Sequence, residues 1–129
     1  MNDRVVLDAS VILAIIAREQ GHEKLSPQLL ARAVASTVNV SEAHAKLVSR
    51  GWTPEEAWED CTSPIPEMLP FEEEHAKIAG SLVRHTQPLG LSLGDRACLA
   101  LGISLDAPVY TAEKSWKKLA LNVKVRLIR

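Results

Sequence analysis

The stretch VVLDASVILAIIA, residues 5–17, carries the clearest structural pattern in the chain. Its first three residues, 5–7, form a β-branched and apolar run, which predicts a buried strand that ends at Asp8. The apolar run over residues 11–17 is too long and too continuous to be a second strand so soon after the first. It predicts a mostly buried helix that is capped by Asp8 or Ser10. A buried strand that leads directly into a buried helix is typical of an α/β domain.

The rest of the chain alternates strand-like and helix-like runs in the same way. Gly21 marks the predicted end of the first helix, and the TPEE of residues 53–56 has the N-cap, proline and glutamate of a strong helix start. The further predicted strands are residues 33–38, 65–69, 109–110 and 123–127. The further predicted helices are residues 23–30, 39–49, 53–63, 71–85, 92–103 and 113–119. This alternation predicts one domain over residues 1–129, a three-layer α/β/α sandwich with a central, mostly parallel sheet.

Four carboxylates sit where an apolar or strand-like run gives way to a helix-like run: Asp8, Glu42, Asp95 and Glu113. In a parallel α/β sheet these junctions share one edge, so the four residues can converge there. Two carboxylates 5 Å apart repel by roughly 3 kcal/mol at an effective dielectric constant near 20, so such a cluster must take up protons, stay open to water or bind cations. Oxygen ligands without a nearby Cys or His select the hard ions Mg²⁺ or Mn²⁺. Such an ion implies phosphodiester hydrolysis by metal-activated water.

Helix capping is the alternative explanation for the same acidic residues. Asp8, Glu42 and Asp95 all lie at predicted helix starts, and both Asn39-x-x-Glu42 and Ser92-x-x-Asp95 have the spacing of a capping box. Taken singly, each of these acids is better explained as a cap than as a metal ligand. Four such junctions in one small α/β domain favour the metal site.

The bulk composition is that of an ordinary globular protein, with 47% hydrophobic and 24% charged residues. The net charge of −1 gives the whole domain no electrostatic attraction for nucleic acid. The C-terminal part differs, because residues 114–129 contain six basic residues and no acidic one. This segment predicts either a local basic surface or a solvated terminal strand and helix face.

Two cysteines without a CxxC or Cys/His ligand spacing favour a reducing compartment, the cytoplasm. The N-terminus lacks the layout of a signal peptide, and its apolar run, residues 9–17, is too short to span a bilayer, so we expect no membrane partner.

Four segments together resemble the motifs of PIN-domain nucleases, in the same order along the chain. They are VVLDASVILAII with Asp8, TVNVSEAHAKL with Glu42, LSLGDRACLALG with Asp95, and VYTAEKSW with Thr111 and Glu113. No single motif is specific, but the ordered set of four at this spacing is. The chain is most similar to the small, single-domain PIN toxins of VapBC toxin–antitoxin pairs.

This resemblance implies an Mg²⁺- or Mn²⁺-dependent endoribonuclease that acts on RNA, forms a homodimer and is inhibited by a small cognate antitoxin. It implies that Asp8, Glu42 and Asp95 are the main metal-binding and catalytic carboxylates, and that Glu113 is the fourth, at a place where the family usually has Asp. Polar residues at matching positions are expected to support the metal or its waters: Ser10, Thr111 and, as an alternative to an N-cap, Asn39.

Basic and aromatic residues near these motifs have both a functional and a structural explanation. Arg96, Lys46, Lys114 and Lys117 are candidates for steering the RNA backbone, although each is also compatible with plain surface. The first helix, its neighbour up to residue 30 and the helix that contains Trp58 are expected to form an apolar groove for an antitoxin segment, by analogy with the family.

Two other functions compete with the ribonuclease. A catalytically impaired PIN-like domain that only binds RNA or a protein is compatible with Glu113 in place of Asp. A receiver-type phosphoacceptor domain would need an acidic pair after its first strand and an Asp after its third, and the sequence has neither.

Overall fold

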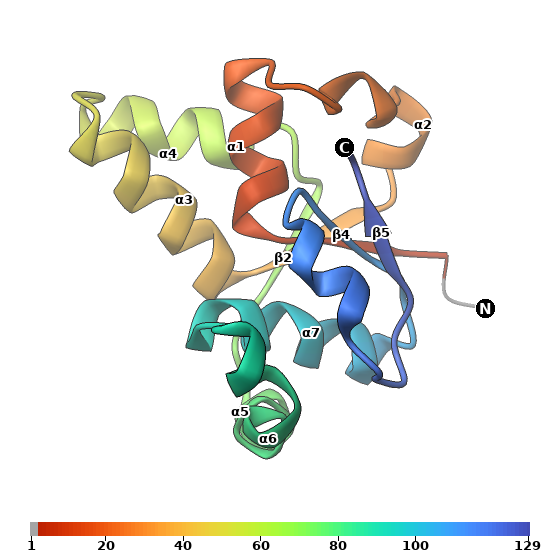
Figure 1. Ribbon diagram of the computed structural model, residues 1–129. Coiled ribbons are helices and arrows are strands. Elements are labelled where there is room, and N and C mark those ends of the chain that lie inside the picture. The colour runs from red at the N-terminus through yellow and green to blue at the C-terminus, as the bar shows by residue number, and fades with distance from the viewer. Residues whose placement is uncertain (1–2) are drawn as a thin grey trace.

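The computed structural model describes residues 3–129 and contains a five-stranded parallel sheet with the strand order β3-β2-β1-β4-β5. The strands are β1 (Val5–Leu7), β2 (Ala33–Ser36), β3 (Glu67–Leu69), β4 (Val109–Thr111) and β5 (Val125–Leu127). Each of the four strand pairings is parallel, so all five strands end at the same edge of the sheet (Figure 1). The predicted sheet is therefore confirmed and is fully parallel. Across residues 3–129, no helix has the length and apolar character needed to cross a bilayer.

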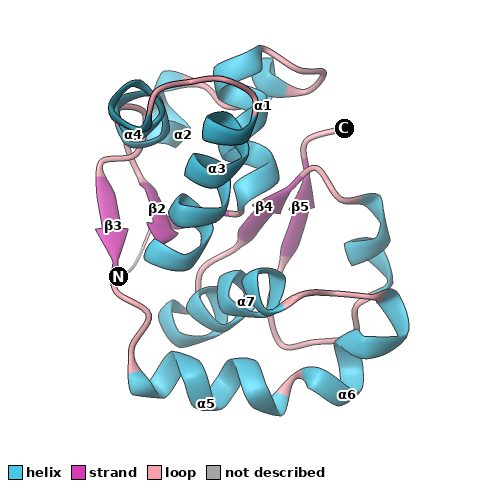
Figure 2. Ribbon diagram, turned by 90° about the vertical axis from the view of Figure 1, so that its left-hand side faces the viewer, coloured by secondary structure: helices cyan, strands magenta, loops and turns pink. Residues whose placement is uncertain are grey.

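Helices cover both faces of this sheet. They are α1 (Ala9–Ala17), α2 (Pro27–Leu30), α3 (Thr37–Ser49), α4 (Pro54–Thr62), α5 (Glu73–Ser81), α6 (Val83–Thr86) and α7 (Leu93–Leu105), with the 3₁₀ turns η1 (His22–Lys24), η2 (Gln87–Leu89) and η3 (Lys114–Lys118). Val5 and Leu7 pack in one hydrophobic cluster with α1, α3 and α4, whereas Val6 packs in a second cluster with α7 and Trp116. Figure 2 shows α7 between the sheet and α5. The three-layer α/β/α architecture is thus confirmed.

Several predicted helix boundaries differ from the structure. α1 ends at Ala17, because Arg18 adopts a left-handed conformation (φ 52°) and its N–H bonds the Ala14 carbonyl, so no glycine is needed. α3 begins at Thr37 rather than Asn39, because the Ser36 hydroxyl accepts from the Val38 N–H and takes the N-cap position.

Three predicted helices also differ in length or type. In place of the predicted helix over residues 23–30, the structure has η1 followed by α2. The helix is interrupted because the residue before a proline disfavours the helical conformation, and Pro27 is the first residue of α2. The predicted helix over residues 71–85 is α5 and α6, and that over residues 113–119 is the 3₁₀ turn η3.

A glycine allows the loop after α1 to approach the end of β5. Gly21 has a left-handed φ of 95°, and a Cβ atom at this position would lie 2.2 Å from the Ile128 carbonyl oxygen. Only a residue without a side chain fits this approach. The contact places η1, which begins at the next residue, beside the last residues of the chain.

We therefore expect Gly21→Ala to lower the free energy of unfolding by about 2–4 kcal/mol, since it adds a backbone clash to the cost of a left-handed alanine. Gly51→Ala is the matched control, because Gly51 has a similar φ of 105° but no atom within 4 Å of the added Cβ. The control should cost only about 1–2 kcal/mol, the backbone term alone. Urea unfolding of both variants measures the difference, and equal losses would contradict the close approach.

Candidate active site

The four carboxylates predicted from the sequence belong to different elements near one edge of the sheet. Asp8 directly follows β1, and Glu113 follows β4 by two residues. β1 and β4 are parallel neighbours, with Leu7 paired to Tyr110, so both strands deliver their acids to the same side. Asp95 lies in the first turn of α7, and Glu42 lies in the second turn of α3.

Three of these acids line one solvent-accessible hollow of about 310 Å³: Glu42, Asp95 and Glu113. Its wall also includes Lys46, Ser92, Ser115 and Trp116. Asp8 is not part of this lining and is buried, with 3% of its surface exposed. The charge of Asp95 nevertheless acts on Asp8, whose pKa it helps to raise. The structure thus gathers three acids in a hollow and places the fourth within electrostatic reach.

A buried thiol lies within electrostatic reach of three of the carboxylates. Cys98 lies one turn after Asp95 on α7 and is fully buried. Burial raises its pKa most, and the charges of Asp8, Asp95 and Glu42 raise it further. Carboxylates that are 34 or more residues apart in sequence therefore converge around the start of α7.

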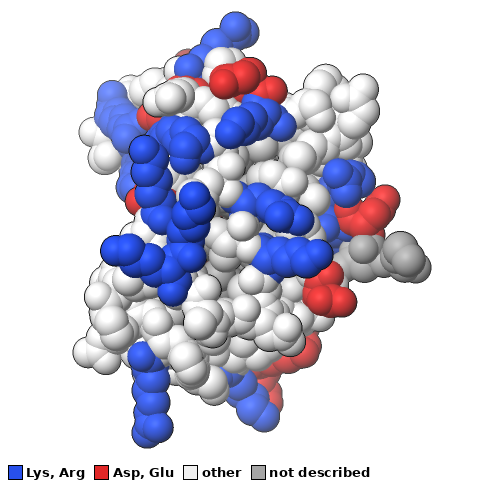
Figure 3. All heavy atoms as spheres, turned by 45° about the vertical axis from the view of Figure 1, so that its right-hand side comes forward, with Lys and Arg blue, Asp and Glu red and all other residues white. Residues whose placement is uncertain are grey.

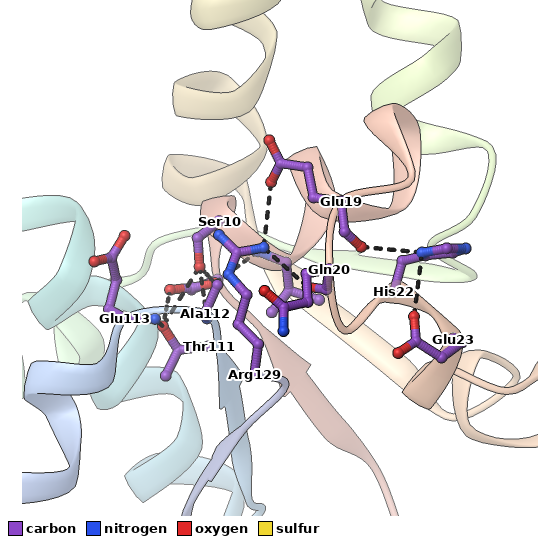
Figure 4. A network of polar contacts seen from close by, with 11 residues as sticks. Ser10, Glu19, Gln20, His22, Glu23, Thr111, Ala112, Glu113 and Arg129 are labelled. Carbon is purple, nitrogen blue, oxygen red and sulfur yellow. Dashed lines mark hydrogen bonds and ion pairs between the residues drawn. The ribbon is translucent and has the colours of Figure 1, made fainter.

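Asp8 is held by three hydrogen-bond donors at the junction of β1 and α1. Its Oδ1 accepts from the Ser10 hydroxyl at 2.6 Å and from the Val11 N–H at 3.0 Å, and its Oδ2 accepts from the Thr111 hydroxyl at 2.6 Å. Ser10 in turn accepts from the Ala112 N–H at 2.9 Å (Figure 4). Ser10 and Thr111, which were predicted as supporting residues, thus lie directly against Asp8, which also serves as the predicted N-cap of α1.

Burial dominates the acidity of Asp8. It raises the pKa to about 6 from the usual 3.8, against the opposing effects of the Ser10, Thr111 and Val11 hydrogen bonds. The negative charge of Asp95 adds a smaller increase. A carboxylate that is costly to ionise inside the protein gains from any cation that binds nearby.

Asn39 positions Glu42 against the first turn of α7. The Asn39 side chain is buried, and its amide nitrogen donates to the Gly94 carbonyl at 2.9 Å and to Glu42 Oε1 at 3.4 Å. Burial raises the pKa of Glu42 most, followed by Asp95, whereas Asn39 and Lys46 lower it. The expected capping box between Asn39 and Glu42 is wrong, because Asn39 is the third residue of α3 and Ser36 is the cap.

Gly94 is a part of the site that the sequence analysis missed. A Cβ atom here would lie 2.4 Å from Glu42 Oε1, so the carboxylate rests directly on the glycine. The sequence does contain one indication of this role. Glycine has a low helix propensity, so a glycine in the first turn of a predicted helix indicates that close packing excludes a side chain there.

Asp95 and Glu113 are held less firmly than Asp8. Asp95 closes the predicted capping box of α7, since its Oδ2 accepts from the Ser92 N–H at 2.9 Å and its own N–H donates to the Ser92 hydroxyl at 3.2 Å. It therefore both caps α7 and lines the hollow. Glu113 has an exposed side chain, and its N–H donates to the Thr111 hydroxyl at 3.0 Å.

The candidate RNA-steering residues fall into two groups. Lys46 lines the hollow, and Lys114 and Lys117 are exposed on η3. Arg96 does not point to the hollow as a free cation, because its Nη1 donates to the Ala79 carbonyl at 2.9 Å on α5. This bond links α7 to α5, and the role of Arg96 in RNA steering stays a prediction.

The donor set fits a hard divalent cation that keeps part of its water shell. Within residues 3–129, no three acidic, histidine or cysteine side chains are close enough to form a ready-made cage. Mg²⁺ does not need one, since it commonly retains several waters and uses one or two carboxylates together with substrate phosphate. The buried Asn39 Oδ1, which has no hydrogen-bond partner in the described chain, is a further oxygen beside Glu42.

The raised pKa of Asp8 makes a prediction about stability. Its folded-state pKa of about 6 lies above its usual 3.8, so the folded state binds the proton more tightly and the wild type loses stability as the pH rises through this window. Asp8→Asn removes that loss and keeps an N-cap side chain. We expect the variant to gain about 3 kcal/mol over the wild type at pH 7.5 and almost nothing at pH 3.5. Denaturant unfolding at both pH values tests this, and a pH-independent difference would contradict it.

Comparison with known proteins places the chain in a family. The PIN domain profile matches residues 5–122, whereas no curated protein sequence matches the chain. Among solved structures, the chain resembles VapBC from Salmonella typhimurium bound to DNA, with a TM-score of 0.77, 13% identity, and coverage of 98% of this chain and 99% of that one. It also resembles VapBC2 from Rickettsia felis bound to a promoter DNA fragment, with a TM-score of 0.72, 18% identity, and coverage of 95% and 97%.

A third similar structure is VapC20 from Mycobacterium tuberculosis, a sarcin–ricin loop cleaving toxin. The TM-score is 0.70 at 15% identity, with 93% of this chain and 98% of that chain covered. At these identities the structural matches show a shared fold, and the profile match covers most of the chain. The chain belongs to the PIN-domain family.

Proposed function

We propose that this protein is an endoribonuclease that uses Mg²⁺ or Mn²⁺ and acts as the toxin of a toxin–antitoxin pair. The observation that carries the proposal is the convergence of Asp8, Glu42 and Asp95 around the start of α7, beside a hollow that is open to solvent. Family membership supports it, as does the resemblance to VapC20, a sarcin–ricin loop cleaving toxin.

The assigned roles follow from how each residue is held. Asp8, Glu42, Asp95 and Glu113 would hold the ion directly or through water. A bound divalent ion supplies an acidified water for attack on phosphorus and neutralises developing charge on the phosphate oxygens. Ser10 and Thr111 fix both oxygens of Asp8, so this carboxylate presents a single orientation to the site. Asn39 holds one oxygen of Glu42, through a hydrogen bond of 3.4 Å to its Oε1.

The remaining side chains of the hollow suit a phosphate-containing substrate. Lys46 lines the wall beside Glu42 and supplies a positive charge for a phosphate oxygen. The Ser10 and Thr111 hydroxyls are bonded to Asp8, and the Cys98 thiol is fully buried with a raised pKa, so none of these three groups is a free nucleophile. Attack by water is the chemistry that these residues support.

The proposed protein partners are a small cognate antitoxin and a second copy of the chain. Several structures with the same fold are toxin–antitoxin complexes, including VapBC from Salmonella typhimurium. The apolar groove expected for an antitoxin has a counterpart in exposed aromatic surface near α4, where Trp52 and Trp58 are 37% and 45% exposed. The ring of Trp58 packs edge-on against His44 of α3, so this surface is continuous over both helices.

The alternative function is a PIN-like domain that binds RNA or a protein without cleaving it. Glu113, at a place that the family usually fills with Asp, is the feature that favours it. Its side chain is exposed and longer by one methylene than that of Asp. Metal-dependent cleavage by the purified wild type would exclude this alternative.

Asp95→Asn should reduce cleavage of single-stranded RNA in Mn²⁺ by at least a hundredfold, because it removes the charge that lines the hollow and couples to both Asp8 and Glu42. Asp106→Asn is the matched control at the other end of α7, where Asn is well tolerated in the left-handed conformation. The control should cleave like the wild type, and EDTA should stop both. Equal cleavage by the wild type and Asp95→Asn would refute the proposed metal site.

Gly94→Ala should reduce cleavage about tenfold or more while leaving the fold intact, since the new Cβ displaces the flexible end of Glu42 rather than backbone. Gly80→Ala in α5 is the control, because no atom lies within 4 Å of its added Cβ. That control should gain up to about 1 kcal/mol of stability from helix propensity and keep full activity. Thermal unfolding and cleavage rates measured side by side separate the two effects. Unchanged cleavage by Gly94→Ala would show that the position of Glu42 does not matter.

A further inference from the structure

A second hollow lies along the outer edge of the sheet. It measures about 430 Å³ and is lined by Lys24, Lys117, Val125, Arg126, Leu127 and Arg129. We call it the basic hollow, because four of these six residues are cationic and none is acidic. β5 is the last strand of the sheet and pairs only with β4 in the described part of the chain, so one side of this strand borders the basic hollow. Figure 3 shows Lys and Arg side chains gathered on this face of the molecule.

Three separate segments build the basic hollow. Lys24 comes from η1, which the close approach of Gly21 to Ile128 sets beside the end of β5. Lys117 comes from η3, which packs against β5, and Arg126 lies on β5 itself. Residues 114–129 contain six basic residues and no acidic one, so the preceding residues hold nine basic and all sixteen acidic residues. The chain is therefore polarised, with its positive charge concentrated at this edge.

Most of the charge in the basic hollow is available to a ligand. Arg129 is engaged, because its Nη1 lies 3.5 Å from Glu19 Oε1 and donates to the Gln20 carbonyl at 3.0 Å. Lys24, Lys117 and Arg126 are exposed, and none of the three forms an ion pair with any side chain of residues 3–129. Three unneutralised cations around one concave surface attract a polyanion.

RNA, the proposed substrate, needs a basic surface that lies outside the cleavage site. The active-site hollow is lined by Glu42, Asp95 and Glu113, with Lys46 as its single cation. This lining repels the phosphate backbone of RNA until a metal ion neutralises it, and the net charge of −1 gives no general attraction. Affinity for RNA must therefore come from a basic surface outside the acidic hollow.

η3 connects the two hollows directly. Ser115 and Trp116 line the active-site hollow, and the next residue, Lys117, lines the basic hollow. An RNA strand that leaves the cleavage site over η3 would therefore reach Lys117 of η3 and Arg126 of β5, the strand against which η3 packs.

We propose that the basic hollow binds the phosphodiester backbone of the RNA strand that flanks the cleavage site. This inference rests on the proposed ribonuclease function and adds the path of the substrate to it. The contacts are charge contacts to phosphates, so they supply affinity and orientation without reading the base sequence.

Protection of the sheet edge is the structural alternative, because charged residues on an edge strand discourage pairing with another sheet. Charge reversal separates the two explanations. Lys117→Glu/Arg126→Glu keeps a charged edge and therefore the protection, but it replaces attraction for phosphate by repulsion. Lys77→Glu/Arg84→Glu, on exposed positions of α5 and α6, changes the net charge equally and serves as the control.

The experiment measures cleavage of a 20-nucleotide RNA and of a hexanucleotide that contains the same cut site, in Mn²⁺ at several salt concentrations. For the long RNA, Lys117→Glu/Arg126→Glu should raise KM about tenfold with little change in kcat, and it should lower the salt dependence of binding by about one to two units of slope. The hexanucleotide should be cleaved equally by the wild type, the variant and the control. Unchanged KM and salt dependence for the long RNA would overturn the proposal.

Two further outcomes distinguish this proposal from the proposed function. If the wild type binds the long RNA without cleaving it, and the double variant loses that binding, the basic hollow stands and the nuclease function fails. If the double variant binds RNA normally but no longer binds polyglutamate, the basic hollow serves an acidic protein segment and the proposal is overturned. Size-exclusion chromatography should show the same oligomeric state for both double variants, because each keeps charged side chains at the altered positions.

Discussion

The burial of one carboxylate at the end of the central strand determines how the rest of this site is arranged. Asp8 follows β1, and its two oxygens accept from Ser10, Val11 and Thr111. These bonds join the start of α1 to the end of β4, so the same contacts that keep the carboxylate in place also fix two elements of the sheet edge. An acid in this position is costly, since burial raises its pKa to about 6. The ionised Asp8 carboxylate therefore lowers the stability of the fold at neutral pH, while its hydrogen bonds hold this anionic group in one position.

Much of the fold and the identity of the acids could be predicted from residue patterns. The alternation of apolar strands and helices was sufficient for a parallel sheet with helices on both faces, because burial on both sides leaves few other arrangements. The positions of Asp8 and Asp95 followed from strand and helix boundaries, which local patterns define well. The TPEE segment formed its capping box as predicted, because both partners lie within one turn.

The orientation of long side chains could not be predicted in the same way. Arg96 sits next to Asp95 in sequence, but one step along a helix turns a side chain by about 100°, and its guanidinium reaches the Ala79 carbonyl on α5. Asn39 has the spacing of a cap, yet Ser36 occupies that position and leaves Asn39 inside the helix, against Gly94. Both outcomes depend on tertiary neighbours, which a local pattern does not contain.

The Cys98 thiol, which lies within electrostatic reach of three site carboxylates, is held in its unreactive protonated form. Oxidants and alkylating agents attack the thiolate form of cysteine, and the pKa of Cys98 is raised by burial and by three nearby carboxylates. The sulfur is also sealed from solvent by the packing of α7 on the sheet. The Cys98 sulfur is thereby kept out of redox chemistry for as long as α7 stays folded.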